Sequence, residues 1–255
     1  MKQTVKWIVM YFIVICLLLG PRGVIRSEGE SATQKKIAIV IDDLGNDMQG
    51  TKEIMELAAP ITVAVMPFLP TTKRDAEWAH SVGYDVLVHM PMEPVKGKKS
   101  WLGPGAITTD LSDDEIRQRV VAAIEEVPFA VGINNHMGSK VTADKRVMRI
   151  VLEVCKEKNL LYLDSKTTHK SVVQAVANEV GLRTLENNIF MDDVYTRDHI
   201  VKQALKVLKY VDDHDTTVVI GHVGPPGKHT AAVLKQSIPS IQKKAQLVTI
   251  SKLAP

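Results

Sequence analysis

The chain has 255 residues, of which 45% are hydrophobic and 24% are charged, and its formal net charge is +3. This length and composition allow one large α/β domain, or two small ones, with a buried core. The positive charge is small and dispersed, and no basic run is interleaved with aromatic residues, so nucleic acid is excluded as an expected partner.

The first 30 residues differ in character from the rest. Lys2 and Lys6 precede an apolar run over residues 7–19, and the sequence turns polar by Arg26. A basic start followed by a short apolar run is typical of a secretory signal, and this run is shorter than the roughly 20 residues that comfortably span a bilayer. Because no A-x-A-like cleavage site follows, an uncleaved membrane anchor through residues 7–19 stays open as the alternative. We therefore expect an exported protein, secreted or anchored in the cell envelope, whose globular domain covers residues 35–255.

From residue 35 onward, short apolar segments alternate with amphipathic ones. The apolar segments are rich in valine and isoleucine, which suits strands of a sheet that is covered on both faces. The strand candidates are residues 37–41, 62–66, 85–88, 130–133, 160–163, 188–191, 217–220 and 247–250.

Helical patterns separate these strands. Ser112 and Glu115 have the spacing of a capping box, and an apolar face follows them with Ile116 and Val120. Gly181 is predicted to end a helix over residues 172–180. Further helices are expected over residues 146–158 and 201–211. Cys155 lies in the apolar pattern of residues 146–158, so we interpret it as a core residue and not as a nucleophile.

The alternation of strands and helices predicts parallel strands, arranged as a distorted (β/α) barrel of about seven units. A doubly wound open sheet is the structural alternative. In either architecture the working face lies where the C-terminal ends of the strands meet.

Polar residues follow nearly every predicted strand at this end. They are Asp42 and Asp43, His89 with Glu93 beyond it, Asn134, Asn135 and His136 with Ser139 beyond them, Asp164, Asp192 and His222. Each alone has an ordinary structural explanation, since a strand-end aspartate often caps the next helix and a lone histidine is usually a hydrogen-bonded loop residue. Together they favour a site, because a carboxylate with two imidazoles is the open ligand set of a catalytic zinc-type ion. A second aspartate beside that ion would stay ionised and act as a general base.

With these residues at the strand ends, the sequence resembles the polysaccharide deacetylase superfamily, and most closely its divergent branch. The motifs that carry the resemblance are IDDLGND, VAVMPFLP, LVHMPMEP, GINNHMGS, LYLDS and IGHVGPP, in this order along the whole exported domain. The resemblance implies a distorted (β/α) barrel, a divalent metal that is usually zinc-like, and hydrolysis of an acetyl group, most often N-acetyl, from a carbohydrate polymer. It also implies that Asp42 is the general base, that Asp43 and His89 bind the metal, and that His222 protonates the leaving group.

Two departures from the family pattern concern the metal site. The family has His-x-x-x-His where this chain has His89 followed by Glu93, so the second histidine is missing. We expect His136, from the neighbouring strand, to complete the ligand set, with Glu93 as the competing ligand. The Arg-x-Pro-Tyr stretch of the family is replaced by residues 134–138, so the arginine that steadies the catalytic aspartate is missing as well.

The sequence thus predicts a metal-dependent carbohydrate deacetylase whose remaining polar residues contact substrate, namely Asn134, Asn135, Ser139, Asp164 and Asp192. Two rival interpretations are a catalytically impaired metal- and glycan-binding protein of the cell envelope and, less favoured, a phosphoester hydrolase. The paired aspartates argue against the first, because sugar binding needs no base beside a metal. The lack of a G-x-x-x-x-G-K phosphate-binding loop argues against the second.

Overall fold

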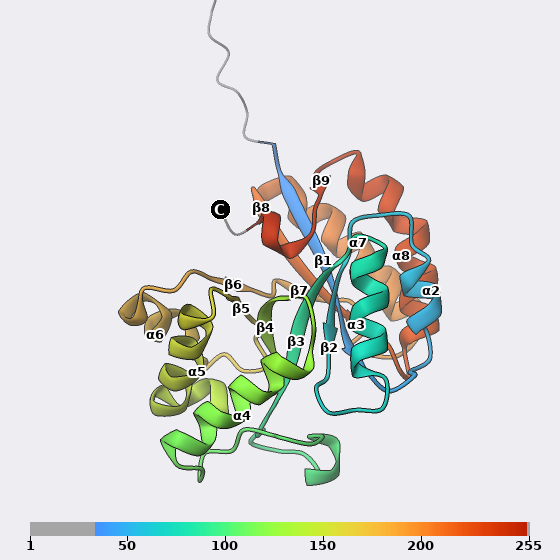
Figure 1. Ribbon diagram of the computed structural model, residues 1–255. Coiled ribbons are helices and arrows are strands. Elements are labelled where there is room, and N and C mark those ends of the chain that lie inside the picture. Colours follow the sequence, from blue (N-terminus) through green and yellow to red (C-terminus); the bar gives the residue numbers. More distant parts are fainter. Residues whose placement is uncertain (1–33, 254–255) are drawn as a thin grey trace, which may run out of the picture. The chain divides into compact units, whose positions relative to one another are not determined.

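Figure 1 shows the computed structural model, which describes residues 34–253. The strands of this region form one sheet in the order β6-β5-β4-β3-β2-β1-β8-β7, and β9 pairs with β1 outside this path. Every pairing is parallel. The strands are β1 (Lys36–Leu44), β2 (Thr62–Val65), β3 (Asp85–Met92), β4 (Ala130–Met137), β5 (Leu161–Asp164), β6 (Thr184–Glu186), β7 (Ile189–Phe190), β8 (Thr216–His222) and β9 (Gln246–Leu247).

Helices cross between these strands, as parallel pairing requires. They are α2 (Thr51–Met55), α3 (Thr72–Ser81), α4 (Asp113–Glu126), α5 (Lys145–Glu157), α6 (Val173–Val180), α7 (Arg197–Asp213) and α8 (Gly227–Gln242), with short 3₁₀ turns η1 (Lys99–Trp101), η2 (Val141–Ala143) and η3 (Ile250–Lys252). Within residues 34–253 none of the helices has the length and hydropathy needed to cross a bilayer. The predicted signal or anchor segment lies outside the described residues.

The prediction of a distorted (β/α) barrel is confirmed. The sheet curls, and β6 and β7 are the two ends of its hydrogen-bonded order, so the barrel stays open between them. Figure 1 shows α4, α5 and α6 grouped beside the β4–β6 half of the sheet, and α2, α7 and α8 beside the β1–β8 half.

Several local predictions hold as well. Ser112 and Glu115 form the reciprocal hydrogen bonds of a capping box at the start of α4. Gly181 adopts a left-handed conformation with φ of 73° at the end of α6. Cys155 is fully buried in α5, and burial raises the pKa of its thiol to about 12. The expected strand over residues 247–250 is wrong in its second half, because Ile250 already begins the turn η3.

The buried residues form two clusters on opposite faces of the strands. Along β1, Ile37, Ile39 and Ile41 pack with the helices, whereas Ala38 and Val40 belong to a cluster made of strand residues and the C-terminal segment. Successive side chains of a strand point to opposite faces, so the second cluster marks the inner face of the curled sheet.

The inward-facing positions continue at every second residue up to the C-terminal ends of the strands. Asp42 continues the positions of Ala38 and Val40, and His89 continues that of Leu87. His222 likewise follows Val218 and Ile220 in β8. The same alternation that buries the apolar interior therefore brings these polar residues together above it.

Candidate metal centre and acid–base site

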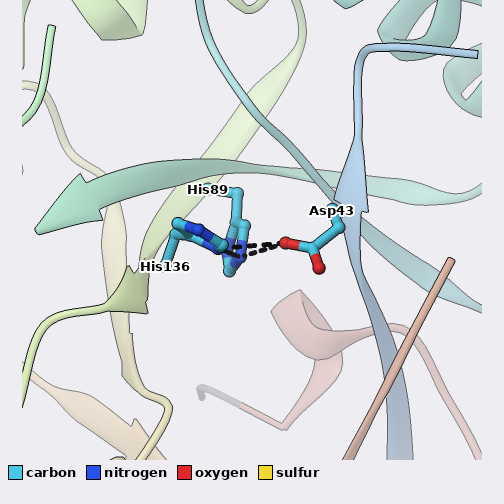
Figure 2. Close-up of side chains that lie close together, drawn as sticks. All are labelled: Asp43, His89 and His136. Atoms are coloured by element: carbon cyan, nitrogen blue, oxygen red, sulfur yellow. Dashed lines mark hydrogen bonds and ion pairs between the residues drawn. The ribbon is translucent and has the colours of Figure 1, made fainter. Parts of the chain in front are cut away.

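Three ligand-type side chains converge at the C-terminal ends of β1, β3 and β4. The Oδ1 atom of Asp43 lies 3.2 Å from Nε2 of His89 and 3.0 Å from Nδ1 of His136. The two imidazole nitrogens are 3.1 Å apart. Figure 2 shows the three side chains pointing toward one another. This cluster contains the ligands that the sequence predicted, with His136 as the third.

The outer hydrogen bonds of both imidazoles fix which nitrogen carries the proton. His89 donates from Nδ1 to Oδ1 of Asn134 at 2.8 Å, and His136 donates from Nε2 to the carbonyl oxygen of Trp101 at 3.0 Å. A neutral imidazole that donates from one nitrogen has a lone pair on the other. The inward nitrogens of both histidines therefore present lone pairs to the carboxylate of Asp43.

Three acceptor atoms this close, with no hydrogen between them, need a cation. Oδ1 of Asp43 is buried and accepts no hydrogen bond within the described chain. Zinc–nitrogen bonds of about 2.0–2.1 Å in tetrahedral geometry place neighbouring ligand atoms about 3.3 Å apart. The donor set and its spacing thus fit a zinc-class ion.

The backbone explains how two adjacent aspartates reach the same site. In a regular strand Asp42 and Asp43 would point to opposite faces of the sheet. Here Asp43 has a positive φ of 71°, and the pairing of β1 with β2 shifts register between Ile41 and Leu44. This bulge turns Asp43 toward the same pocket as Asp42.

Asp42 is almost fully buried beside the metal cluster. The amide nitrogen of Asn134 donates to its Oδ1 at 2.9 Å, and Nδ1 of His89 lies 3.7 Å from its Oδ2. Burial raises the pKa of Asp42, although His89 and His222 act to lower it. Asn134 thus orients the carboxylate of Asp42, a task for which the family uses the arginine that this sequence lacks. The raised pKa makes Asp42 a stronger base.

His222 is held by a second carboxylate. Nδ1 of His222 donates to Oδ1 of Asp192 at 2.7 Å, and the backbone N–H of His222 donates to Oδ2 of Asp192 at 2.7 Å. Thr230 also donates to Oδ2 of Asp192, which is fully buried. Burial acts to lower the pKa of His222, but Asp192 raises it to about 9. The ring is therefore protonated near neutral pH, as a general acid must be.

These groups line one pocket with a volume of about 460 Å³. Asp42, Asp43, His89, His136 and His222 are all among its lining residues. Aromatic side chains also line the pocket, and two of them, Trp101 and Tyr195, are each 58% exposed.

The residues expected to contact substrate are divided by the structure. Asn135 and Asp192 line the pocket, although both also bind within the protein. Asn134, Ser139 and Asp164 do not line it. Asn134 holds Asp42 and His89, and Ser139 accepts from the backbone of Val95. Asp164 follows the inward-facing Leu163 by one residue, so it points to the other face and binds Ser171.

Glu93, the competing metal ligand, is engaged elsewhere. Its carboxylate accepts from Nζ of Lys140 at 2.8 Å and from the backbone and side chain of Thr109 at 3.0 and 3.1 Å. It is not part of the ligand cluster. The geometry therefore favours His136 over Glu93.

Two functional contacts were missed by reasoning from the sequence. The carbonyl oxygen of Trp101 has no sequence signal, because every residue carries one. The pairing of Asp192 with His222 had a signal, since both residues follow strands and β7 pairs directly with β8.

The sequence pattern of the divergent polysaccharide deacetylase family matches residues 39–254. An uncharacterised protein of Haemophilus influenzae is 36% identical over 223 residues, which cover 88% of this chain and 78% of that protein. The uncharacterised protein YibQ of Escherichia coli is 34% identical over 218 residues, which cover 86% and 67% of the two chains.

Solved structures share the fold. The crystal structure of an uncharacterised protein from Agrobacterium tumefaciens matches with a TM-score of 0.80 at 17% identity, covering 88% of this chain and 90% of that one. A peptidoglycan N-acetylglucosamine deacetylase matches with a TM-score of 0.56 at 14% identity, covering 86% and 88%. A CE4 family pseudoenzyme from Bacillus anthracis matches with a TM-score of 0.51 at 14% identity, covering 87% and 66%. These similarities extend over most of the chain and support the barrel architecture.

Proposed function

Because this chain belongs to the divergent polysaccharide deacetylase family, we propose that it is a metal-dependent hydrolase that removes N-acetyl groups from a carbohydrate polymer. The observation that carries the proposal is the convergence of three metal-type ligand atoms in a pocket that also holds a buried aspartate and a charged histidine. A simple sugar-binding site would need neither of the last two groups.

Asp43, His89 and His136 would hold the metal, for which we propose zinc. When bound, such an ion polarises the acetyl carbonyl and increases the acidity of the attacking water.

Asp42 is the group that removes a proton from water. Its carboxylate is fixed by the amide of Asn134, and burial raises its pKa, so it combines a defined orientation with increased basicity. The water oxygen then adds to the carbonyl carbon of the acetyl group, and the proton stays on Asp42.

His222 holds the proton that the leaving group needs. Asp192 binds Nδ1, so Nε2 is the nitrogen available to the pocket. As the C–N bond breaks, His222 transfers a proton to the departing amine, and the products are acetate and a free amino sugar.

The test is the substitution Asp42→Asn, which keeps the side-chain shape. We expect turnover to fall by about 100-fold or more, the usual contribution of a general base, while metal content stays at the wild-type level. Release of acetate from N-acetylglucosamine oligomers and metal analysis of the purified domain measure both effects. Asp47→Asn is the matched control, because Asp47 follows the same strand but pairs with Arg74 outside the pocket.

Full activity in Asp42→Asn would remove this residue from its role. A wild-type protein that binds metal and glycan but releases no acetate would instead support the impaired, glycan-binding alternative.

We also propose that the protein acts outside the cytoplasm, on a glycan of the cell envelope. This rests on the basic and apolar pattern of the first 30 residues. Fractionation of cells that express the full chain tests it, and recovery of the protein in the cytosol alone would contradict it.

A further inference from the structure

The connection after β3 crosses beside the metal cluster, and we name residues 93–109 the strap. Its middle carries the turn η1, where the carbonyl oxygen of Trp101 accepts the Nε2 proton of His136 at 3.0 Å. The strap is the source of the outer contact that sets the tautomer of this metal ligand. It also brings Trp101 to the pocket lining.

Both ends of the strap are fastened at Glu93. The backbone N–H of Glu93 donates to the carbonyl of Ile107 at 2.9 Å, and the carbonyl of Glu93 accepts from the backbone of Lys140 and Val141 at 3.1 and 3.2 Å. Ile107 in turn donates to the carbonyl of Pro91 at 2.8 Å. The base of the strap is thereby joined to β3 and to the turn that follows β4.

The side chain of Glu93 closes the same junction. One carboxylate oxygen accepts from both the backbone and the hydroxyl of Thr109, the last residue of the strap, at 3.0 and 3.1 Å. The other accepts from Lys140 at 2.8 Å. Burial acts to raise the pKa of Glu93, but Lys140 and Thr109 lower it, so the carboxylate is ionised and its bonds are charge-assisted.

We propose that Glu93 is a positioning residue for the metal centre, acting through the strap on the carbonyl of Trp101 and thereby on His136. This inference rests on the metal site of the proposed function. Partners of a metal-bound histidine fix its tautomer and ring orientation, and their loss weakens metal binding without removing a ligand. The strap spans more than a dozen residues, so the place of its middle depends on how firmly its ends are held.

The alternative is that Glu93 is itself a ligand, as its place four residues after His89 suggests. Both of its oxygens are occupied by Thr109 and Lys140, which argues against direct binding. The two roles predict different outcomes when the side chain is removed.

The experiment measures zinc affinity by competition with a chelator in wild type, Glu93→Ala, Glu93→Gln and His136→Ala. We expect Glu93→Ala to weaken zinc binding by about 10-fold or more, the range observed for partners of metal ligands. Glu93→Gln keeps an oxygen that can accept from Thr109, so it should restore most of the affinity. Glu179→Ala is the matched control, because Glu179 also pairs with basic side chains, those of Lys145 and Arg149, but lies in α6 and outside the strap; its affinity should stay close to wild type.

Two further measurements separate positioning from ligation and from general unfolding. The absorption spectrum of the cobalt-substituted protein should be shared by wild type and Glu93→Ala, since the same ligands remain. The melting temperature of metal-free Glu93→Ala should stay near that of the metal-free wild type.

Unchanged zinc affinity in Glu93→Ala would overturn the proposal, and so would a cobalt spectrum altered as in His136→Ala. Neither result would touch the proposed deacetylase activity. A wild-type protein that binds no metal would instead remove the proposed function and this inference together.

Discussion

At the scale of single residues, Asp192 sets the protonation state of His222, the proposed general acid. Asp192 is fully buried and receives three hydrogen bonds, two from His222 and one from Thr230. A fixed negative charge at this distance favours the imidazolium form. His222 can therefore remain an acid well above the pH at which an ordinary histidine loses its proton.

We expect Asp192→Asn to lower the pKa of His222 from about 9 toward the ordinary histidine value. Titration of the His222 ring by NMR in the metal-free protein measures this change. Asp193→Asn is the matched control, because Asp193 is the next residue but binds His199, and it should leave the titration of His222 unchanged. A pKa of about 9 that persists in Asp192→Asn would show that Asp192 is not its cause.

The same pair links stability to pH. The folded-state pKa of His222 lies above the unfolded value of about 6.5, so its contribution to stability is fully present below that pH. It is lost as the pH rises through about 9. In Asp192→Asn this decline should shift to lower pH, which denaturant unfolding at a series of pH values detects.

The charged side chains of the pocket could be predicted from the sequence, whereas the residues that orient these side chains were harder to predict. Asp42, His89, His136 and His222 lie at the C-terminal ends of strands of a parallel sheet, so topology brings them to one end of it. Asp43 needs the bulge in β1 as well. The bridging role of Asn134 needed the register of β3 against β4, which pairs His89 with Asn134. That register is a property of the folded sheet, and the sequence of neither strand alone determines it.

At the scale of elements, the loops that follow β1 and β8 are locked together by two glycines. A Cβ atom on Gly227, the first residue of α8, would lie 2.1 Å from the carbonyl oxygen of Gln49. Gly50 approaches the same point from the other loop with a positive φ of 89°. The backbone of Gly224 also donates to the carbonyl of Gln49 at 2.8 Å. Because these loops follow the strands of Asp42 and His222, their contact fixes the proposed base and the proposed acid relative to each other.

We expect Gly227→Ala to destabilise the protein by about 1–3 kcal/mol, because the new methyl group meets backbone that cannot move aside cheaply. Denaturant unfolding measures the loss. Ala232→Ser, at an exposed position of the same helix, should cost about 0.5 kcal/mol. Equal stability of the two variants would mean that the loops have room to separate.

The elements themselves were predicted to different degrees. Long, strongly patterned ones such as α4 and α5 were recognisable, since capping and an apolar stripe agree there. The strand β6 was missed because its three half-buried residues show no alternation. The helix α2 was also missed, because its five residues are too few to show a helical period.

At the scale of the whole molecule, the metal should couple the site to the stability of the barrel. Its proposed ligands come from β1, β3 and β4, and β2 lies between the first two of these strands. An ion held by all three strands binds only the folded chain, so it stabilises the fold by mass action.

We expect zinc at about 1,000 times its dissociation constant to stabilise the protein by about 4 kcal/mol, which raises the melting temperature by roughly 10 °C. Thermal unfolding with zinc and with a chelator measures the difference. His136→Ala should abolish most of it, whereas His169→Ala, at an exposed position away from the cluster, should retain it. An identical melting temperature with and without zinc in the wild type would contradict a metal centre of this kind.

The bulge at Asp43 leaves a trace that can be recognised in the sequence itself. In an unbroken strand, two acids that face one pocket must occupy alternate positions and would be spelled Asp-x-Asp. Here the register shift and the left-handed backbone of Asp43 let both acids face the pocket from consecutive positions. Two adjacent aspartates at positions 42 and 43 that both face the pocket therefore indicate a distortion of the main chain as well as a pair of carboxylates.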